Sequence, residues 1–353
     1  MLVSVIGFQH IFLWGKRMFQ LKLAQVFSGM ALSLMLLLPA LGSHAQDAAP
    51  ASQGVIGAGN YIRVVEDLDR TQTFYYELLG VEPRGGLITR EFGPNEPVAA
   101  MYNAVGGEFR GVTFPVPNST FFLEHLEWRG TDRSKQSTEI QDSGNAVLLL
   151  FVKDIEQAIA SIRAQGGSVV TPGGEAVTAG DNRFILAQDP DGYFIELLQI
   201  SNSSLSAPGN VLDGRFRLVV GDAEKSSSFY REAMGFGYPR DNSFTSNEIL
   251  GAINGYQQDY SLLTAQVPGS TLPLELLQYR SGSREKLQQH LPRIGSSMLR
   301  IFVSDLDRVV SNALAAGAVL AANNESAVSL NGSRFQIIED PDGLLLQLVQ
   351  RPR

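Results

Sequence analysis

Two polar side chains interrupt apolar runs at the same place in two copies of one motif. Asp-Pro-Asp-Gly at 189–192 leads into Tyr-Phe-Ile-Glu-Leu, and the same four residues at 340–343 lead into Leu-Leu-Leu-Gln-Leu. A Pro/Gly turn between two apolar runs predicts a tight β-hairpin. Glu196 and Gln347 are the polar residues of the two second strands. Because burying an unpaired carboxylate is costly, Glu196 is either a ligand-binding group or an outward-facing residue.

Other reactive side chains are scarce in this chain. It contains no cysteine and four histidines, of which only His125 and His290 follow residue 45. No Ser/His/Asp set and no cysteine nucleophile can be assembled from such a supply. The carboxylates Glu124, Glu196 and Glu275 are therefore the main candidates for chemistry.

Composition and charge limit the class of protein and its partners. With 353 residues, 44% of them hydrophobic and 18% charged, the chain can build a sizeable core and about two domains of ~150 residues. The formal net charge is −8, which argues against binding to nucleic acid or to anionic membranes. The electrostatics instead favour a small neutral or cationic ligand, or no ligand at all.

The first 45 residues predict a secretory signal peptide. Basic residues precede an apolar run at 26–41, and Ser-His-Ala at 43–45 offers a small-residue cleavage site before Gln46. Cleavage would leave a periplasmic or secreted protein that is not attached to the membrane. An uncleaved membrane anchor is the alternative, although the apolar run is shorter than the ~20 residues of a membrane span. Translation can start at Met1 or at Met18.

The rest of the chain aligns with itself. Asp154 and Asp189 match Asp305 and Asp340 at an offset of 151 residues, and earlier positions match at an offset of 155. These matches predict two homologous modules. The predicted divisions are a flexible leader at 46–55, module 1 at 56–200, a linker at 201–210 and module 2 at 211–351.

Each module itself consists of two similar halves. Every half opens with an apolar strand, followed by an Asp that caps a helix, the helix, a Gly that ends it, and three further strands. This unit occurs four times, so the predicted fold class is α+β. The capping residues are Asp67, Asp154, Asp222 and Asp305, and the glycines are Gly80, Gly166, Gly235 and Gly317.

This pattern resembles the vicinal-oxygen-chelate superfamily, which includes glyoxalase I, bleomycin- and fosfomycin-resistance proteins and extradiol dioxygenases. The resemblance is carried by Asp67, Phe74-Tyr75 and Gly80, and by the two Asp-Pro-Asp-Gly turns. It implies four βαβββ units whose mixed sheets form cups, with metal ligands pointing into each cup from four strands.

The resemblance places ligand positions on residues of mixed chemistry. Family members generally carry His or Gln and His at the first and third positions, and Glu at the second and fourth. Here the four positions fall on Asn60, Glu124, Val147 and Glu196 in module 1, and on Arg215, Glu275, Met298 and Gln347 in module 2. Arginine cannot ligate a metal, and we expect Arg215 to pair with Glu275 instead.

Glu124 and Glu196 of module 1 are the candidate metal ligands. With Asn60 they would form an all-oxygen site that holds Mg²⁺, Ca²⁺ or Mn²⁺ only weakly. Without a cation, two facing carboxylates would repel, and one would have a raised pKa. If halves of different modules share a cup, Glu124 joins Gln347 and Glu196 joins Glu275, and both sets are poorer for a metal.

A second interpretation is a binding pocket. Phe122, Glu124, Leu126 and Trp128 share one face of a predicted strand and would make a mostly apolar ligand pocket, unless the aromatics are ordinary core residues. The main hypothesis is an exported protein that binds a small apolar or aromatic molecule and has degenerate metal sites. The alternatives are a metal-dependent lyase, isomerase or dioxygenase using module 1, and a structural or partner-binding protein with inactive cups. A homodimer remains open.

Overall fold

The computed structural model describes residues 54–352 apart from 94–95, 202, 244–250, 254, 256–258, 281–284 and 322–324. The predicted signal peptide, its cleavage site and the alternative start at Met18 lie outside these residues. The predicted leader at 46–55 lies outside them up to residue 53, and Val55 already begins the first strand. Within the described ranges, no helix has the length and apolar character needed to cross a membrane.

The described chain consists of strands and helices that repeat the predicted unit. Residues 55–199 form β1 (Val55–Val64), α1 (Leu68–Leu79), β2 (Ile88–Glu91), α2 (Pro97–Met101), β3 (Glu108–Pro115), β4 (Phe122–Arg129), β5 (Ala146–Val152), α3 (Ile155–Ala164), β6 (Ser168–Val169), β7 (Val177–Ala179), β8 (Asn182–Gln188) and β9 (Phe194–Gln199). Residues 211–350 form β10 (Val211–Val219), α4 (Ala223–Met234), β11 (Tyr260–Gln266), β12 (Pro273–Tyr279), β13 (Ser297–Val303), α6 (Leu306–Ala315), β14 (Val319–Leu320), β15 (Val328–Leu330), β16 (Ser333–Glu339) and β17 (Leu345–Gln350). The predicted α+β class is confirmed.

The long helices begin at the predicted aspartates, and α1 and α4 end at the predicted Gly80 and Gly235. Helices α3 and α6 are capped by Gln165 and Ala316, one residue before the predicted glycines. The side chain of Asp67 accepts a hydrogen bond from the backbone of Arg70 at the start of α1, and Asp222 does the same for Lys225 in α4. Asp154 and Asp305 cap α3 and α6 in the same way. These carboxylates satisfy amide groups that the first helical turn leaves unpaired.

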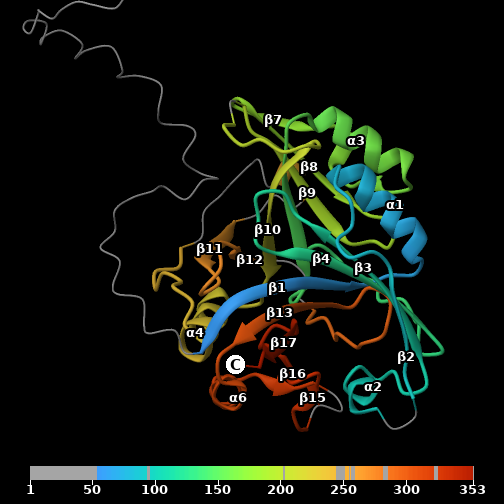
Figure 1. The fold of residues 1–353 in the computed structure, drawn as a ribbon. Coiled ribbons are helices and arrows are strands. Elements are labelled where there is room, and N and C mark those ends of the chain that lie inside the picture. The colour runs from blue at the N-terminus through green and yellow to red at the C-terminus, as the bar shows by residue number, and fades with distance from the viewer. Residues whose placement is uncertain are drawn as a thin grey trace, which may run out of the picture. The chain divides into compact units, whose positions relative to one another are not determined.

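The strands form two mixed sheets, and each sheet combines one half of each module. Sheet 1 has the order β14-β16-β17-β13-β1-β4-β3-β2, and sheet 2 has the order β11-β12-β10-β5-β9-β8-β6. β1 pairs with β13 (Figure 1) and β10 pairs with β5, and both pairs are antiparallel. The halves that share a sheet therefore come from different modules.

One face of each sheet contributes to a core between the sheets. Tyr61 of β1 packs against Phe216 of β10 with ring centroids 4.2 Å apart, and both belong to the main buried cluster. Because strand side chains alternate between faces, Asn60 and Ile62 point to the opposite face from Tyr61. We call the face of sheet 1 that carries Asn60 cup 1, and the corresponding face of sheet 2 cup 2.

The two Asp-Pro-Asp-Gly turns join hairpin strands, as predicted, and also anchor the hairpins to helices. In the first turn, Asp189 accepts a hydrogen bond from Tyr75 Oη at 2.8 Å, and Asp191 accepts one from Thr71 Oγ1 at 2.9 Å. In the second turn, Asp340 accepts one from Tyr230 Oη at 2.7 Å. Helix α1 packs on β3 and β4 of sheet 1, and α4 packs on β11 and β12 of sheet 2. These bonds therefore link the hairpin of one sheet to a helix that covers the other sheet.

The two anchors differ in charge. Arg63 is fully buried and its Nη1 lies 3.6 Å from Asp189 Oδ2. In module 2 the position that matches Arg63 at the 155-residue offset is Leu218. Burial raises the pKa of Asp340 to about 7, and the neighbouring Asp342 adds to this rise. Burial also raises the pKa of Asp189, but there the Arg63 charge opposes the rise.

Candidate functional site

A chain of polar groups crosses cup 1. Asn60 Nδ2 on β1 donates to Glu124 Oε2 on β4 at 2.6 Å. Arg300 on β13 lies between Glu124 and Gln347: its Nη1 is 3.1 Å from Glu124 Oε2, and its Nε donates to Gln347 Oε1 at 2.6 Å. Gln347 Nε2 in turn donates to Tyr102 Oη at 2.5 Å. Four strands and the end of helix α2 thus meet in one hydrogen-bonded group.

The register of sheet 1 explains why Arg300 occupies the centre of this group. β13 and β17 are parallel neighbours, and Arg300 is the register partner of Gln347. β13 also pairs with β1, where Ile62 faces Met298. Arg300 therefore projects onto the same face as Asn60, Glu124 and Gln347.

An aromatic cluster lies beside the polar group. The ring centroid of Trp128 is 5.4 to 5.8 Å from those of Phe92, Tyr102 and Phe109, and the Trp128 side chain is buried. Phe122 is partly exposed and lies under the guanidinium of Arg84, at 5.0 Å. The chain's own aromatic residues therefore surround Trp128.

The polar group of cup 1 reaches solvent. The side chains of Glu124 and Arg300 are 18% and 21% exposed, whereas Gln347 is fully buried. Solutes can thus reach the carboxylate and the guanidinium, and the amide behind them is shielded.

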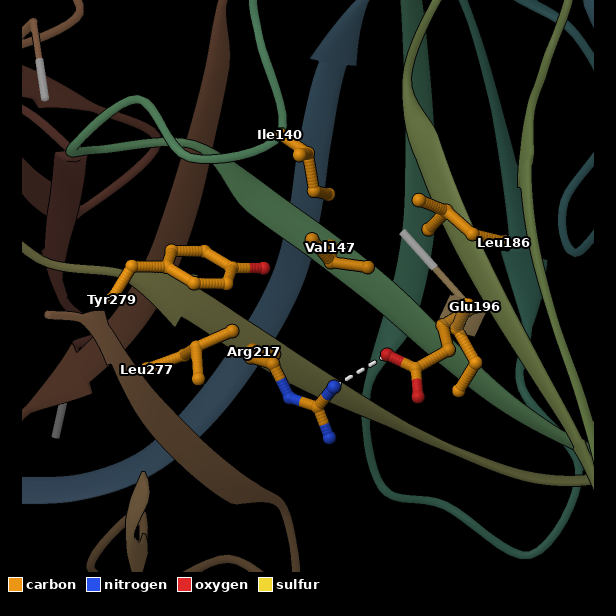
Figure 2. A pocket seen from close by; sticks show the side chains of 8 residues that line it. Ile140, Val147, Leu186, Glu196, Arg217, Leu277 and Tyr279 are labelled. Carbon is orange, nitrogen blue, oxygen red and sulfur yellow. Dashed lines mark hydrogen bonds and ion pairs between the residues drawn. The ribbon is translucent and has the colours of Figure 1, made fainter. Parts of the chain in front are cut away.

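Cup 2 contains a buried arginine between two glutamates. Arg217 on β10 donates to Glu275 Oε2 on β12 from Nε at 3.0 Å and from Nη2 at 2.9 Å. Its Nη1 pairs with Glu196 on β9 (Figure 2). Arg215 contributes a weaker contact, with its Nη1 3.6 Å from Glu275 Oε1. The side chains of Arg217, Glu196 and Glu275 are only 5–6% exposed.

Burial and charge act in opposite directions on these groups. Burial raises the pKa of Glu196; the Arg217 charge opposes this rise and the Glu275 charge adds to it. Burial lowers the pKa of Arg217, but Glu196 and Glu275 more than compensate, so that its pKa is raised overall. The arginine therefore stays charged, and its positive charge lies against both carboxylates.

The space beside Arg217 is small. Figure 2 shows Arg217 and Glu196 with Tyr279 and with aliphatic side chains that include Val147 and Leu186. The centre of a water molecule can occupy about 10 Å³ within the cavity that these side chains line. The cavity therefore has room for about one water. Among the described residues, the side chains that line this cavity are closely packed.

Comparison of the chain with known proteins shows the family to which this fold belongs. The model of the Glyoxalase/Bleomycin resistance protein/Dioxygenase superfamily matches residues 57–197 and 214–348. The chain belongs to this superfamily. A lactoylglutathione lyase of Arabidopsis thaliana is 25% identical over 219 residues, 62% of this chain and 68% of the relative. A putative lactoylglutathione lyase of Brassica oleracea matches over 58% of this chain and 63% of its own length.

Shorter relatives and solved structures of glyoxalases are also similar to this chain. A probable lactoylglutathione lyase of Synechocystis is 31% identical over 140 residues, 39% of this chain and 91% of the relative. A crystal structure of a glyoxalase I variant from Zea mays has a TM-score of 0.55 and 23% identity, covering 84% of this chain and 92% of that chain. At this level of identity the structural match establishes the fold alone.

The residues present do not fit the metal ion that this superfamily implies. Glu124 in cup 1 is bonded to Arg300, and Glu196 and Glu275 in cup 2 are bonded to Arg217. A guanidinium keeps its proton in proteins and cannot act as a ligand. Among the described residues, no cluster of three or more His, Cys, Asp or Glu side chains could hold a metal.

The cation comes from a different strand in each cup. Arg300 lies on β13, and the position that matches it in module 1 is Leu149. Arg217 lies on β10, and the position that matches it in module 1 is Ile62. In both cups the arginine contacts a polar side chain on the adjacent strand, Gln347 or Glu275. On its other side it reaches a glutamate two strands away, Glu124 or Glu196. Each cup thus neutralises its carboxylates with its own guanidinium.

Several predicted pairings need correction. Glu124 and Glu196 lie in different sheets, so the expected repulsive pair and its shared metal site do not form. The physical reason is that β4 pairs with β1, whereas β9 pairs with β5, and β1 and β5 belong to different sheets. Arg215 does approach Glu275, but Arg217 is its closer partner.

The remaining predicted residues divide between the two cups. Asn60, Glu124 and Gln347 come together in cup 1, where Met298 packs into the apolar cluster around Trp128. Val147 lines the cavity of cup 2. His125 lies on the opposite face from Glu124, as strand alternation predicts, and stacks on Tyr75 with ring centroids 4.2 Å apart.

Sequence reasoning missed Arg217, Arg300 and Tyr102. The two arginines carry a signal similar to that of Glu196, because each is a charged residue in a strand that is mostly buried. Such a residue needs a partner of opposite charge. Tyr102 follows a short helix in the segment between β2 and β3 and carries no comparable signal.

Proposed function

We propose that this protein binds a small uncharged molecule with apolar or aromatic character in cup 1, without a bound metal ion. The observation that carries the proposal is the position of Arg300 between Glu124 and Gln347. The guanidinium supplies positive charge inside the cup, so the carboxylate needs no metal to be stable there. The partly exposed polar group orients the ligand, and the aromatic cluster next to it supplies apolar contact.

The relatives named lactoylglutathione lyase suggest an enzyme, which is the main competing function. We propose that a metal-dependent activity of that kind is absent here, since Arg300 and Arg217 occupy the carboxylates that would serve as ligands. Cup 2 then acts as a structural counterpart of cup 1, because its polar residues are buried and its cavity holds about one water.

Metal content and activity provide the first test. We expect the purified chain to contain no stoichiometric metal after dialysis, and Mn²⁺, Zn²⁺ or Ca²⁺ to produce neither a thermal shift nor lactoylglutathione lyase activity. The measurements are elemental analysis, a melting curve and a lyase assay. Stoichiometric metal that disappears in Glu124→Gln but persists in the surface variant Glu156→Gln would overturn the proposal.

Ligand binding can be followed through Trp128. The chain has two tryptophans, Trp14 and Trp128, so a Trp14→Phe variant of the full chain reports on cup 1 alone. We expect a small aromatic ligand to change Trp128 emission saturably, and Glu124→Gln/Arg300→Met to weaken its binding. A library of small aromatic compounds without any saturable response would contradict binding in this cup.

We also propose that the chain is exported and that residues 1–45 are removed. The support is the basic region, the apolar run at 26–41 and the Ser-His-Ala sequence at 43–45. Mass spectrometry of the protein from the producing cells is expected to find Gln46, or a residue next to it, at the N-terminus. An intact chain that is extracted only with detergent would instead indicate an uncleaved anchor.

A further inference from the structure

Helix α2 and the residue that follows it fill part of cup 1. Val98, Ala99 and Met101 of α2 are buried in the same apolar cluster as Trp128. The helix has only five residues and no side-chain hydrogen bond at its N-cap. A helix this short has little stability of its own, so its packing into the cup holds it in place.

Tyr102 ends this helix and places a phenol in the polar group of the cup. Its hydroxyl accepts a hydrogen bond from Gln347 Nε2 at 2.5 Å. Its ring centroid lies 5.5 Å from that of Trp128, at an interplanar angle of 47°. Burial raises the pKa of Tyr102, while the nearby Arg300 charge opposes the rise. The cup therefore holds a neutral phenol between an amide donor, a guanidinium and an indole.

The cup is thus already shaped for a hydroxylated aromatic ring. We propose that Tyr102 is a built-in occupant of the ligand site, and that the ligand is a small phenol that replaces its side chain when residues 96–104 move outward. This rests on the proposed binding function of cup 1. Gln347 would donate to the phenol oxygen of the ligand, and Trp128 would contact its ring, as both do with Tyr102.

The proposed movement of residues 96–104 has turn residues at its C-terminal end, and it lowers the apparent affinity for the ligand. Tyr102 is itself partly exposed, and Asn103 and Gly106 after it have positive φ values of 54° and 73°, as in turns. An external phenol competes with the phenol of Tyr102. The apparent affinity of the unmodified chain for the ligand is therefore its intrinsic affinity multiplied by the fraction of molecules in which the segment is open. Removing Tyr102 should therefore tighten phenol binding.

The test uses p-cresol as the probe and toluene as its matched control, in full-length chains carrying Trp14→Phe. We expect Tyr102→Ala to bind p-cresol at least about tenfold more tightly than the parent, by calorimetry and Trp128 emission. We expect it to prefer p-cresol to toluene, and Gln347→Leu in the same background to abolish that preference. A cavity without a phenol site would bind both probes equally with or without Gln347, which overturns the inference.

Hydrogen exchange of the unmodified chain tests the displacement directly and does not depend on the folding of a variant. Saturating p-cresol is expected to speed amide exchange in residues 97–104 while leaving α1 unchanged. No change in 97–104 would overturn the inference. If other aromatic compounds still bind in cup 1, the proposed function stands without the phenol; stoichiometric metal lost in Glu124→Gln would remove the proposed function itself.

Discussion

Replacing Arg217 by methionine is expected to lower the free energy of unfolding by roughly 3–5 kcal/mol at pH 7. The change removes the closest cation of Glu196 and Glu275, which are both buried and lie on either side of it. Two uncompensated carboxylates in a core are far more costly than the loss of the arginine contacts themselves. Denaturant unfolding of parent and variant measures the difference.

Arg215→Met is the matched control for this experiment. Arg215 lies on the same strand and also approaches Glu275, but at 3.6 Å and with 21% of its side chain exposed. We expect it to cost no more than about 1 kcal/mol, as for solvent-screened ion pairs. Adding Glu196→Gln and Glu275→Gln to Arg217→Met should recover most of the loss. Equal losses in the two arginine variants would show that the buried network does not depend on Arg217.

Replacing Arg63 by leucine is expected to make the stability of the protein fall more steeply as pH rises from about 4 to about 8. The substitution gives module 1 the residue found at the matching position of module 2, Leu218. Without Arg63, burial and the Asp191 charge raise the pKa of Asp189, and the hydrogen bonds from Tyr75 and the Tyr193 backbone oppose this rise. Burial raises the pKa of Asp340 in the second turn to about 7. Asp189 would then be protonated in the folded protein at pH values where it is ionised in the unfolded chain.

The sign follows from proton linkage. A carboxyl whose folded pKa lies above its unfolded value stabilises the fold below the unfolded pKa, near 4, and this stability is lost as pH rises through the folded pKa. We expect the variant to lose roughly 2–4 kcal/mol more than the parent between pH 4 and pH 8. Denaturant unfolding across this range measures the loss, and Arg63→Leu/Asp189→Asn, which has no titrating group there, should remove the added slope. A parallel pH profile in Arg63→Leu and parent would contradict the role assigned to Arg63.

Asp340→Asn gives the complementary control. The parent already contains one carboxyl of this kind, so part of its own loss of stability between pH 4 and 7 should come from Asp340. Asparagine keeps the oxygen that accepts hydrogen bonds from the backbone of Asp342 and Leu344 but does not titrate. The slope of stability against pH should be smaller in this variant than in the parent.

Local structure and family membership could both be predicted from the sequence. Helix starts at Asp67 and Asp222, hairpin turns at the two Asp-Pro-Asp-Gly sites, and the opposite faces of Glu124 and His125 all follow from short-range rules. Caps, turns and strand alternation depend on neighbouring residues in the chain. The internal offsets of 151 and 155 residues added the repeat and, through it, the superfamily.

The groups that meet in each cup could not be predicted from the sequence, because they depend on which strands pair. All four units present similar apolar strands, and backbone hydrogen bonds between such strands do not distinguish one partner from another. Pairing of β1 with β13 and of β10 with β5 brought Glu124 to Arg300 and Glu196 to Arg217, instead of bringing the two glutamates together. Charge pairing supplies the physical reason that this arrangement is stable, because each carboxylate in a cup then has a guanidinium beside it.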